Sequence, residues 1–408
     1  MRRLEVRRLS SLVPRGALVL FVGLAARAVH TAPPAPAQAT DPADVADRVD
    51  WPVFLARHDL IWERLPTQWH EGAFTGNGRL GAMIYCRTNH WLCADLGHSE
   101  VVDRGNRIAI GTFALRTLGT SAGGTMRLNL WDAEVTATQT TDRGRIVWRA
   151  FTSATRPVHA IAWHTEGGES AEPLFMHEPA VDARKAFRGE PLGPDDRSPA
   201  PARDEQGPIR TLVQHFRHGG GYALAWTIGR RDQGGEMFWS LVRQPDAAAA
   251  AANVARATAA GWTTLEREHR AWWHSWWPRH FLSIPDTRLE SFYWIQMYKL
   301  GSAARPDGPA IDLMGPWFRA TPWPRYWWNL NLQLTYWPVY AANRLDVGES
   351  LIAMLDRGQS NLMANVPEPF RNDSAAIGRT SDLDCRGPAG AEFGNLTWAL
   401  HNVWLHYR

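Results

Sequence analysis

Cysteine is scarce in this sequence, with only three residues among 408. Cys86, Cys93 and Cys385 cannot all pair with one another, although Cys86 and Cys93 could form a disulfide in an oxidising compartment. The spacing of these two does not fit a zinc site, and the histidines are also scattered without ligand spacing. We therefore expect buried thiols, no metal site and no cofactor.

An excess of charge of either sign is missing as well. The formal net charge is +3, and after the first ten residues no basic run is longer than a dipeptide, which argues against a nucleic-acid partner. The hydrophobic content of 45% and the charged content of 21% are typical of a soluble globular protein. A chain of this length exceeds one ordinary domain, so two or three domains are expected. The oligomeric state is left open.

Apolar runs long enough to cross a membrane are also absent. The nearest, residues 16–25, is too short to span a bilayer comfortably, and it follows four arginines within the first eight residues. With small residues at 37–39, this pattern predicts a secretory signal, followed by a Pro/Ala-rich linker up to residue 45. We expect export to the periplasm or the cell exterior and no membrane partner. A poorly ordered chain start is the alternative.

Tryptophan, by contrast, is abundant, with 22 residues against 8 tyrosines. Several occur in adjacent pairs, namely Trp272-Trp273, Trp276-Trp277 and Trp327-Trp328. One interpretation is a filled core, because tryptophan is highly buried on average. The other is an aromatic-lined cleft, which the excess over the whole chain favours.

Residues 46–245 predict an antiparallel β-sandwich. Short apolar runs alternate with Gly, Asp, Asn and Thr clusters, a rhythm that favours hairpins over alternating strands and helices. Residues 142–145 are expected to form a hairpin turn. The sequence Gly76-Asn77-Gly78 permits positive φ angles and predicts a tight turn into a strand. A phosphate-binding loop is the alternative for it, but neither Lys-Ser/Thr nor a helix signal follows.

The pattern becomes helical after residue 245. An alanine-rich run opens residues 246–284, where Thr263 and Glu266 form a capping box and Pro278 marks a helix end. From residue 285 onward apolar residues recur at helical spacing. We expect a helical linker over 246–284 and an all-helical domain over 285–408.

The stretch from Trp317 to Pro338 carries the strongest functional signal. Asn329 and Asn331 stand two residues apart among indole rings, and on an extended segment they would share a face. Amides beside flat apolar rings suit a ligand covered in hydroxyl groups, such as a sugar. We therefore predict a carbohydrate partner. The predicted sugar-binding residues are Asn331, Arg325, Trp317, Trp327, Trp328, Trp337 and His401, the last with a core side chain as its alternative role.

These motifs resemble glycoside hydrolase family 95, the α-L-fucosidase and α-L-galactosidase family of inverting enzymes. The resemblance covers about residues 60–408 and is most specific at Asn-x-Asn-x-Gln-x-x-Tyr-Trp; its other motifs are Trp62, 76–83 and 302–306. It implies an antiparallel β-supersandwich, a helical linker and an (α/α)6 barrel, with Asn329 and Asn331 at the sugar-binding subsite. Arg325 and Trp327 stand where that family usually carries Asp and His, which leaves the sugar and its linkage open.

The resemblance implies an inverting glycosidase, in which an acid protonates the leaving oxygen and a base activates water. Asn329 would orient that water, and the base carboxylate would lie beyond residue 408. Glu392 is the predicted acid; its alternative role is a favourable charge near a helix N-terminus. The other carboxyls considered are Glu368, Asp373, Asp382 and Asp384.

Residues 285–408 offer roughly half of the room that twelve helices of ~11–12 residues and their loops require. We therefore expect an incomplete barrel and a fragment of a longer enzyme. Two other functions stay open. One is a non-catalytic carbohydrate-binding protein, and the other is a polysaccharide lyase with a helical toroid.

Overall fold

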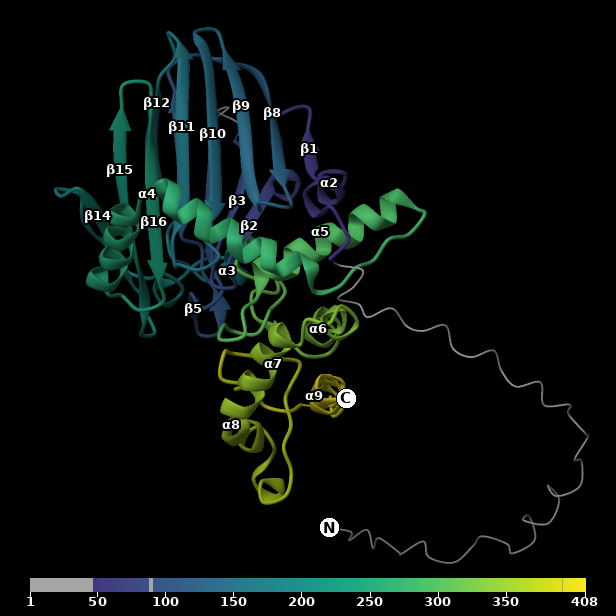
Figure 1. Cartoon of the computed structure of the whole chain (residues 1–408). Coiled ribbons are helices and arrows are strands. Elements are labelled where there is room, and N and C mark those ends of the chain that lie inside the picture. The colour runs from purple at the N-terminus through teal and green to yellow at the C-terminus, as the bar shows by residue number, and fades with distance from the viewer. Residues whose placement is uncertain (1–46, 88–90, 391) are drawn as a thin grey trace, which may run out of the picture. The chain divides into compact units, whose positions relative to one another are not determined.

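The computed structural model describes residues 47–87, 91–390 and 392–408, and in this part β-strands come first and helices follow (Figure 1). The predicted signal and linker lie outside the described residues. The order of β-sandwich and then helices confirms the coarse fold expected from the sequence.

The larger sheet has nine strands in the order β1-β8-β9-β10-β11-β16-β15-β14-β13, and every neighbouring pair is antiparallel. The predicted turn at residues 142–143 joins β9 to β10, which confirms that hairpin. In sheet order the strands are β1 Leu60–Trp62, β8 Ser121–Asn129, β9 Glu134–Thr141, β10 Gly144–Thr152, β11 His159–Gly167, β16 Gly234–Val242, β15 Gly221–Arg231, β14 Ile209–His215 and β13 Ala202–Asp204.

The second sheet has five antiparallel strands in the order β12-β7-β4-β3-β2. Phe113 of this sheet packs against Trp226 and Trp239 of the larger sheet, so the two apolar faces form one core. Cys86 and Cys93 are free, buried thiols, as expected. The strands are β12 Ala171–His177, β7 Gly111–Thr117, β4 Leu92–His98, β3 Leu80–Cys86 and β2 Ala73–Gly76; two small ladders pair β5 Val102–Asp103 with β6 Asn106–Arg107 and β17 Tyr326–Trp327 with β18 Thr380–Ser381.

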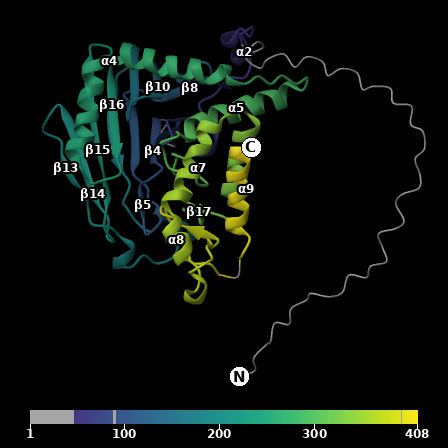
Figure 2. The same ribbon diagram turned by 60° about the horizontal axis from the view of Figure 1, so that its bottom comes forward.

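Helix α4 (Ala247–Trp276) lies along the larger sheet and contacts β14, β15 and β16 (Figures 1 and 2). It begins where predicted, with the Asp246 carboxylate accepting from the Ala249 amide. Gly261 adopts φ 74° and interrupts it, close to the start predicted at Thr263. The other helices are α2 Trp51–Ala56, α3 Ala183–Arg188, α5 Thr287–Ala303, α6 Asn331–Ala341, α7 Leu345–Arg357, α8 Gln359–Ala364 and α9 Asn395–Tyr407, with 3-10 turns η1 Trp69–Glu71, η2 Pro194–Asp196, η3 Trp277–Arg279 and η4 Glu368–Phe370.

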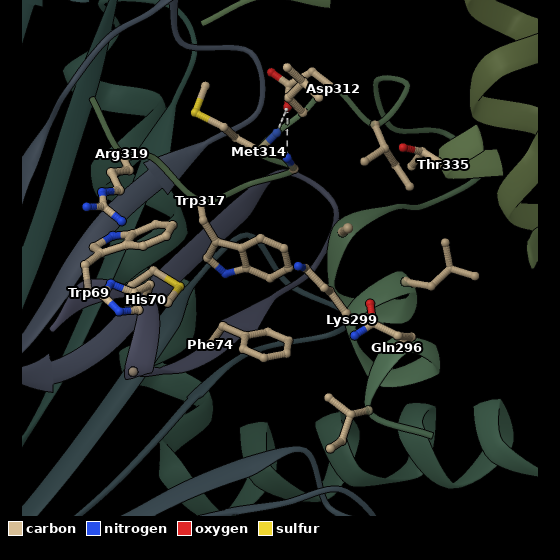
Figure 3. A pocket seen from close by; sticks show the side chains of 18 of the residues that line it. Trp69, His70, Phe74, Gln296, Lys299, Asp312, Met314, Trp317, Arg319 and Thr335 are labelled. Atoms are coloured by element: carbon tan, nitrogen blue, oxygen red, sulfur yellow. Dashed lines mark hydrogen bonds between the residues drawn. The ribbon is translucent and has the colours of Figure 1, made fainter. Parts of the chain in front are cut away.

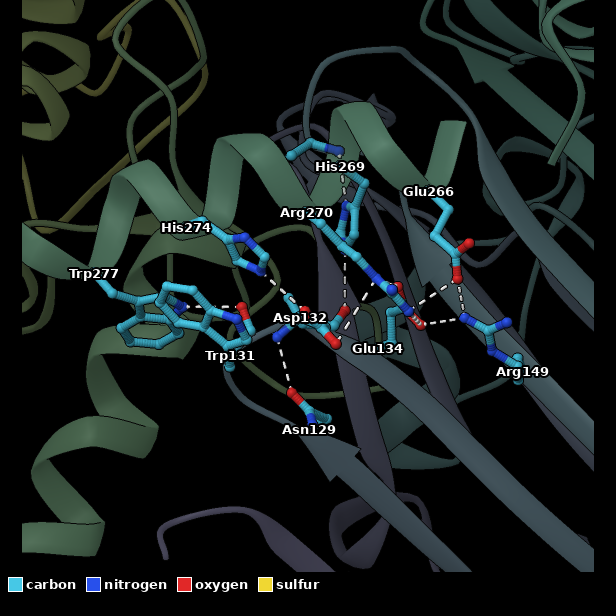
Figure 4. A network of polar contacts seen from close by, with 12 residues as sticks. Asn129, Trp131, Asp132, Glu134, Arg149, Glu266, His269, Arg270, His274 and Trp277 are labelled. Carbon is cyan, nitrogen blue, oxygen red and sulfur yellow. Dashed lines mark hydrogen bonds and ion pairs between the residues drawn. The ribbon is translucent and has the colours of Figure 1, made fainter. Parts of the chain in front are cut away.

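A polar seam fastens α4 to the start of β9 (Figure 4). The buried Glu134 carboxylate accepts from Arg149 at 2.6 Å and from Arg270 at 2.6 and 3.0 Å. Glu266 of the same helix pairs with both arginines. The buried His269 accepts from a backbone amide through Nδ1 and contacts the Ala133 carbonyl through Nε2. We call this cluster the α4 seam; its charges are satisfied within the protein.

The adjacent tryptophan pairs are mainly core, which corrects the expectation that they line a cleft. Trp273, Trp276, Trp277 and Trp328 are each at most 2% exposed. This outcome follows from their place at the end of α4 and in the turn before α6, where large rings fill the junction between sandwich and helices.

Two buried arginines continue this packing. Trp272 and Trp276 stack at 5.5 Å, the Arg305 guanidinium lies 3.9 Å from the Trp272 ring, and that of Arg344 lies 4.0 Å from Trp276. Burial lowers the pKa of both arginines to about 9. The flat guanidinium tolerates this setting because it stacks on the aromatic faces.

The predicted turn at Gly76-Asn77-Gly78 joins β2 to β3. The Asn77 side chain accepts from the amides of Arg79 and Leu80, and Gly78 adopts φ 86°. The Gly78 amide donates to the Ser302 carbonyl at 2.9 Å, so the turn also anchors the end of α5. This confirms the structural interpretation of the motif.

Candidate functional site: an aromatic cavity beside helix α5

A cavity of about 1310 Å³ lies between the second sheet, α5 and the segment 311–323 (Figure 3). Ligand pockets commonly hold ~300–1,000 Å³, so there is room here for more than one sugar ring. Its aromatic walls come from four parts of the chain: β1, η1 and β2, α5, and the 311–323 segment. These rings are Trp62, Trp69, Phe74, Phe292, Trp317 and Trp323.

The wall that carries Trp317 is fastened to the sandwich. Buried Arg107 donates to the Asp312 carboxylate at 3.0 Å and to the carbonyls of Gly315 and Trp317. The Trp317 indole donates to the Thr75 carbonyl of β2 at 2.8 Å. Gly97 of β4 is required here, because a Cβ at this position would collide with the Pro316 carbonyl. These contacts hold the indole against the cavity.

Helix α5 presents one face to the cavity. Phe292, Gln296, Lys299 and Ala303 recur at three- and four-residue steps and line it together. The Tyr298 hydroxyl donates to the Phe74 carbonyl at 2.8 Å, which ties this helix to β2. Figure 3 shows the Gln296 amide and the Lys299 ammonium side by side near the Trp317 ring. Burial in the cavity wall lowers the pKa of Lys299.

The opposite wall is formed by η1. The Trp62 indole donates to the Glu71 carbonyl at 2.7 Å and fixes the backbone of this turn. The Arg319 guanidinium lies 5.7 Å from the centre of the Trp69 ring, within the range of a cation–π contact. His70 and the Glu71 carboxylate complete this side of the cavity.

Three carboxylate residues line the cavity, and two of them are already engaged. Asp312 accepts from Arg107 and from two backbone amides. Asp59 accepts from Arg127 and from the Leu130 amide; its side chain has no exposed surface, and burial raises its pKa. Glu71 is half-buried, and its carboxylate has no hydrogen-bond partner within the described residues. It is therefore the carboxylate available to a ligand.

The predicted asparagine pair does not share a face of an extended segment, which corrects that expectation. Asn329 is exposed in the turn after β17, and Asn331 is the first residue of α6. Neither lines the cavity. Asn331 lies one helical turn before Leu334 and Thr335, which do line it, so it belongs to the same helix face. The catalytic and binding roles assigned to the pair stay predictions.

Of the other predicted sugar-binding residues, only Trp317 lines the cavity. Arg325 donates to the Asn106 side chain and the Arg104 carbonyl, which turns it toward the β5–β6 ladder. Trp327 meets the cavity-lining Trp323 edge to face at 6.3 Å. The remaining three lie elsewhere: Trp328 is buried and donates to Ser381, Trp337 is exposed beside Trp398, and His401 is exposed and stacks on Trp404.

Glu392 pairs with Arg379 and accepts from the Asn395 amide group at 3.2 Å. The hydrogen bond from Arg379 lowers the pKa of Glu392. A general acid must be protonated before it acts, so this environment favours the alternative role, a charge placed before α9.

Sequence reasoning missed Trp69, Phe74, Gln296 and Lys299. The last two had a local signal, because they are polar residues on a helix with an otherwise apolar stripe. Trp69 and Phe74 had none, since their meeting with α5 is set by the tertiary fold.

No cluster of three or more metal-ligating side chains occurs among the residues that the structure describes. Within that same part, no helix combines the length and apolar character needed to cross a bilayer.

Comparison with known proteins places the fold. A protein from the human microbiome that has been assigned as a kojibiose phosphorylase matches 82% of this chain over 51% of its own, with TM-score 0.55 and 8% identity. A bacterial glucoamylase in complex with acarbose matches 86% over 59%, with TM-score 0.52 and 9% identity. The chain thus spans between half and three-fifths of these proteins. No protein-family model and no curated protein matches the sequence.

Proposed function

We propose that this protein is a carbohydrate-active enzyme of the glycosidase type that binds a glycan in the cavity beside α5. The observation that carries the proposal is the wall of rings, Trp69, Phe74 and Trp317, with the Gln296 amide set among them. Flat rings cover the apolar faces of sugars, while an amide both donates to and accepts from hydroxyl groups. The similarity in fold to a phosphorylase and a glucoamylase supports this proposal.

The proposed reaction is hydrolysis with inversion of the anomeric centre. It needs two carboxyl groups ~6.5–9.5 Å apart, one as acid and one as base. Glu71 is the available carboxylate at the cavity. We further propose that α5 to α9 belong to an incomplete (α/α)6 barrel and that the protein is exported, as its amino-terminal sequence predicts.

A second function, carbohydrate binding without turnover, is favoured by one observation. Asp59 and Asp312 are held by arginines and backbone amides, which leaves Glu71 without a second available carboxylate at the cavity among the described residues. A binding protein needs the rings and the amide but neither an acid nor a base.

Calorimetry with a panel of mono- and oligosaccharides tests the location of the site. Trp69→Ala should weaken sugar binding about tenfold or more, because it removes a stacking surface. Asn329→Ala, outside the cavity, is the matched control and should leave the affinity unchanged. The opposite pattern would move the site to the asparagine turn, and binding by neither protein would refute the proposal.

Product analysis by NMR separates the two functions. Release of a sugar with the inverted anomeric configuration supports the hydrolase, and Glu71→Gln should then reduce kcat. Retention of configuration would contradict the inverting mechanism. Tight binding with no release from any glycoside of the panel supports the binding protein.

A further inference from the structure

We infer that the cavity prefers a carbohydrate bearing an anionic group, a carboxylate or a phosphate, over its neutral counterpart. This inference rests on the proposed function and names the class of sugar that the site takes. It follows from an imbalance of charge among the side chains that line the cavity.

The negative charges of the cavity wall are largely neutralised. Arg107 and Asp312 pair at 3.0 Å with side chains only 2% and 4% exposed, so neither charge is available to a ligand. Asp59 is likewise paired with Arg127 beneath the wall. Only Glu71 contributes an uncompensated carboxylate.

The positive charges are not neutralised in this way. Lys299 lies 6.0 Å from the Phe74 ring centre and Arg319 lies 5.7 Å from that of Trp69. Across the described ranges, neither cation has a carboxylate within ion-pair distance. The two approach the cavity from different elements, α5 and the 311–323 segment, as Figure 3 shows. An anionic group on the sugar would supply the partner that the protein itself does not.

The choice of lysine at position 299 strengthens this inference. Lys185 is the only other lysine in the sequence, whereas arginine is used everywhere else. Lys185 binds both oxygens of Asp196, at 2.8 and 2.9 Å, and that hydrogen bonding raises its pKa. Lys299 has the opposite environment, with a lowered pKa and no such partner. A compact ammonium beside aromatic rings suits a carboxylate or phosphate oxygen once that group has lost its water.

Calorimetry on matched sugar pairs tests the preference: glucuronate and glucose 6-phosphate against glucose, and galacturonate against galactose. The acidic member of at least one pair should bind about tenfold more tightly at low salt, and the difference should shrink as salt screens the charges. Lys299→Met should abolish the difference, whereas Lys299→Arg, which keeps the charge, should retain most of it. The glucuronate and phosphate arms distinguish the two sources of the anion.

The two lysines also provide an internal control. Reductive methylation with ¹³C-formaldehyde labels both amines for NMR while keeping their charge. Adding the acidic sugar should shift the Lys299 resonance and raise its pKa, and leave that of Lys185 unchanged. Equal affinity for acidic and neutral sugars, or a preference that survives in Lys299→Met, would overturn this inference and leave the proposed function standing. Absence of binding by every sugar of the panel would instead refute the proposed function.

Discussion

The α4 seam and the cavity are both rich in charged residues, but they differ in how those charges are matched. In the seam, Glu134 and Glu266 share Arg149 and Arg270, so each charge has partners of opposite sign. In the cavity, Lys299 and Arg319 meet aromatic rings instead. The difference separates two uses of charge: matched groups join the sandwich to its helix, and unmatched groups facing an open volume are placed for a ligand.

The largest expected effect comes from breaking the matched pair inside the cavity wall. Asp312→Ala leaves the Arg107 guanidinium buried without a carboxylate, which should lower the free energy of unfolding by about 3–5 kcal/mol. Urea denaturation followed by tryptophan fluorescence measures it. Asp307→Ala is the control, because Asp307 is 79% exposed where it pairs with Arg79 and should change stability by about 0–1 kcal/mol. Equal effects of the two substitutions would contradict the distinction between buried and exposed pairs.

A smaller loss is expected when the seam is broken. Glu134→Gln removes the charge that two arginines share and should cost about 2–3 kcal/mol, below the fully buried case because both guanidinium groups remain partly exposed. Glu166→Gln, which disrupts an exposed pair with Arg145 on β10, is the matched control. Denaturant midpoints measure the difference. Sugar affinity should be unchanged in Glu134→Gln at temperatures where it is folded, and a loss of affinity there would couple the two regions.

Acid should weaken the seam through His269. Burial lowers the pKa of this histidine to about 3, below its ordinary value of 6.5, so below pH 6.5 the unfolded chain takes up a proton that the folded chain refuses. Its contribution to stability is therefore complete above pH 6.5 and is lost by about 1.4 kcal/mol per pH unit as the pH falls toward 3. Urea midpoints at pH 7 and 5.5 measure this slope. His269→Gln keeps an acceptor and a donor without titrating, so it should flatten the slope; an unchanged slope would rule this histidine out as the cause.

The smallest effect is expected at Glu392. Its pairing with the exposed Arg379 places it with the matched charges, so Glu392→Gln should leave both sugar affinity and any sugar release unchanged. Calorimetry and an assay of sugar release check this. A selective loss of kcat with unchanged affinity would return Glu392 to the catalytic role that the sequence suggested.

Local signals in the sequence were sufficient for much of the fold. The Asp246 cap, the hairpin at 142–143 and the turn at 76–78 each depend on a few neighbouring residues, and each is present. The apolar periodicity of α5 was equally readable.

The site was less predictable because its parts meet only in three dimensions. Trp69, Lys299 and Trp317 are far apart in sequence, and nothing local announces their meeting. The opposite error affected Asn329 and Asn331, whose spacing suggested an extended segment although α6 begins at Asn331. The paired tryptophans illustrate a third difficulty, because a ring that fills a core and a ring that meets a sugar have the same identity in the sequence.

The anchoring of the Trp317 wall has a consequence for how a ligand is received. Arg107, Thr75 and Gly97 hold this wall from three different strands or ladders of the sandwich, so its ordering is accomplished when the chain folds. A glycan arriving there meets a preorganised surface and does not have to organise a loose loop. The entropy of association is then spent almost wholly on the sugar, and differences in affinity among glycans should reside in how fast they leave.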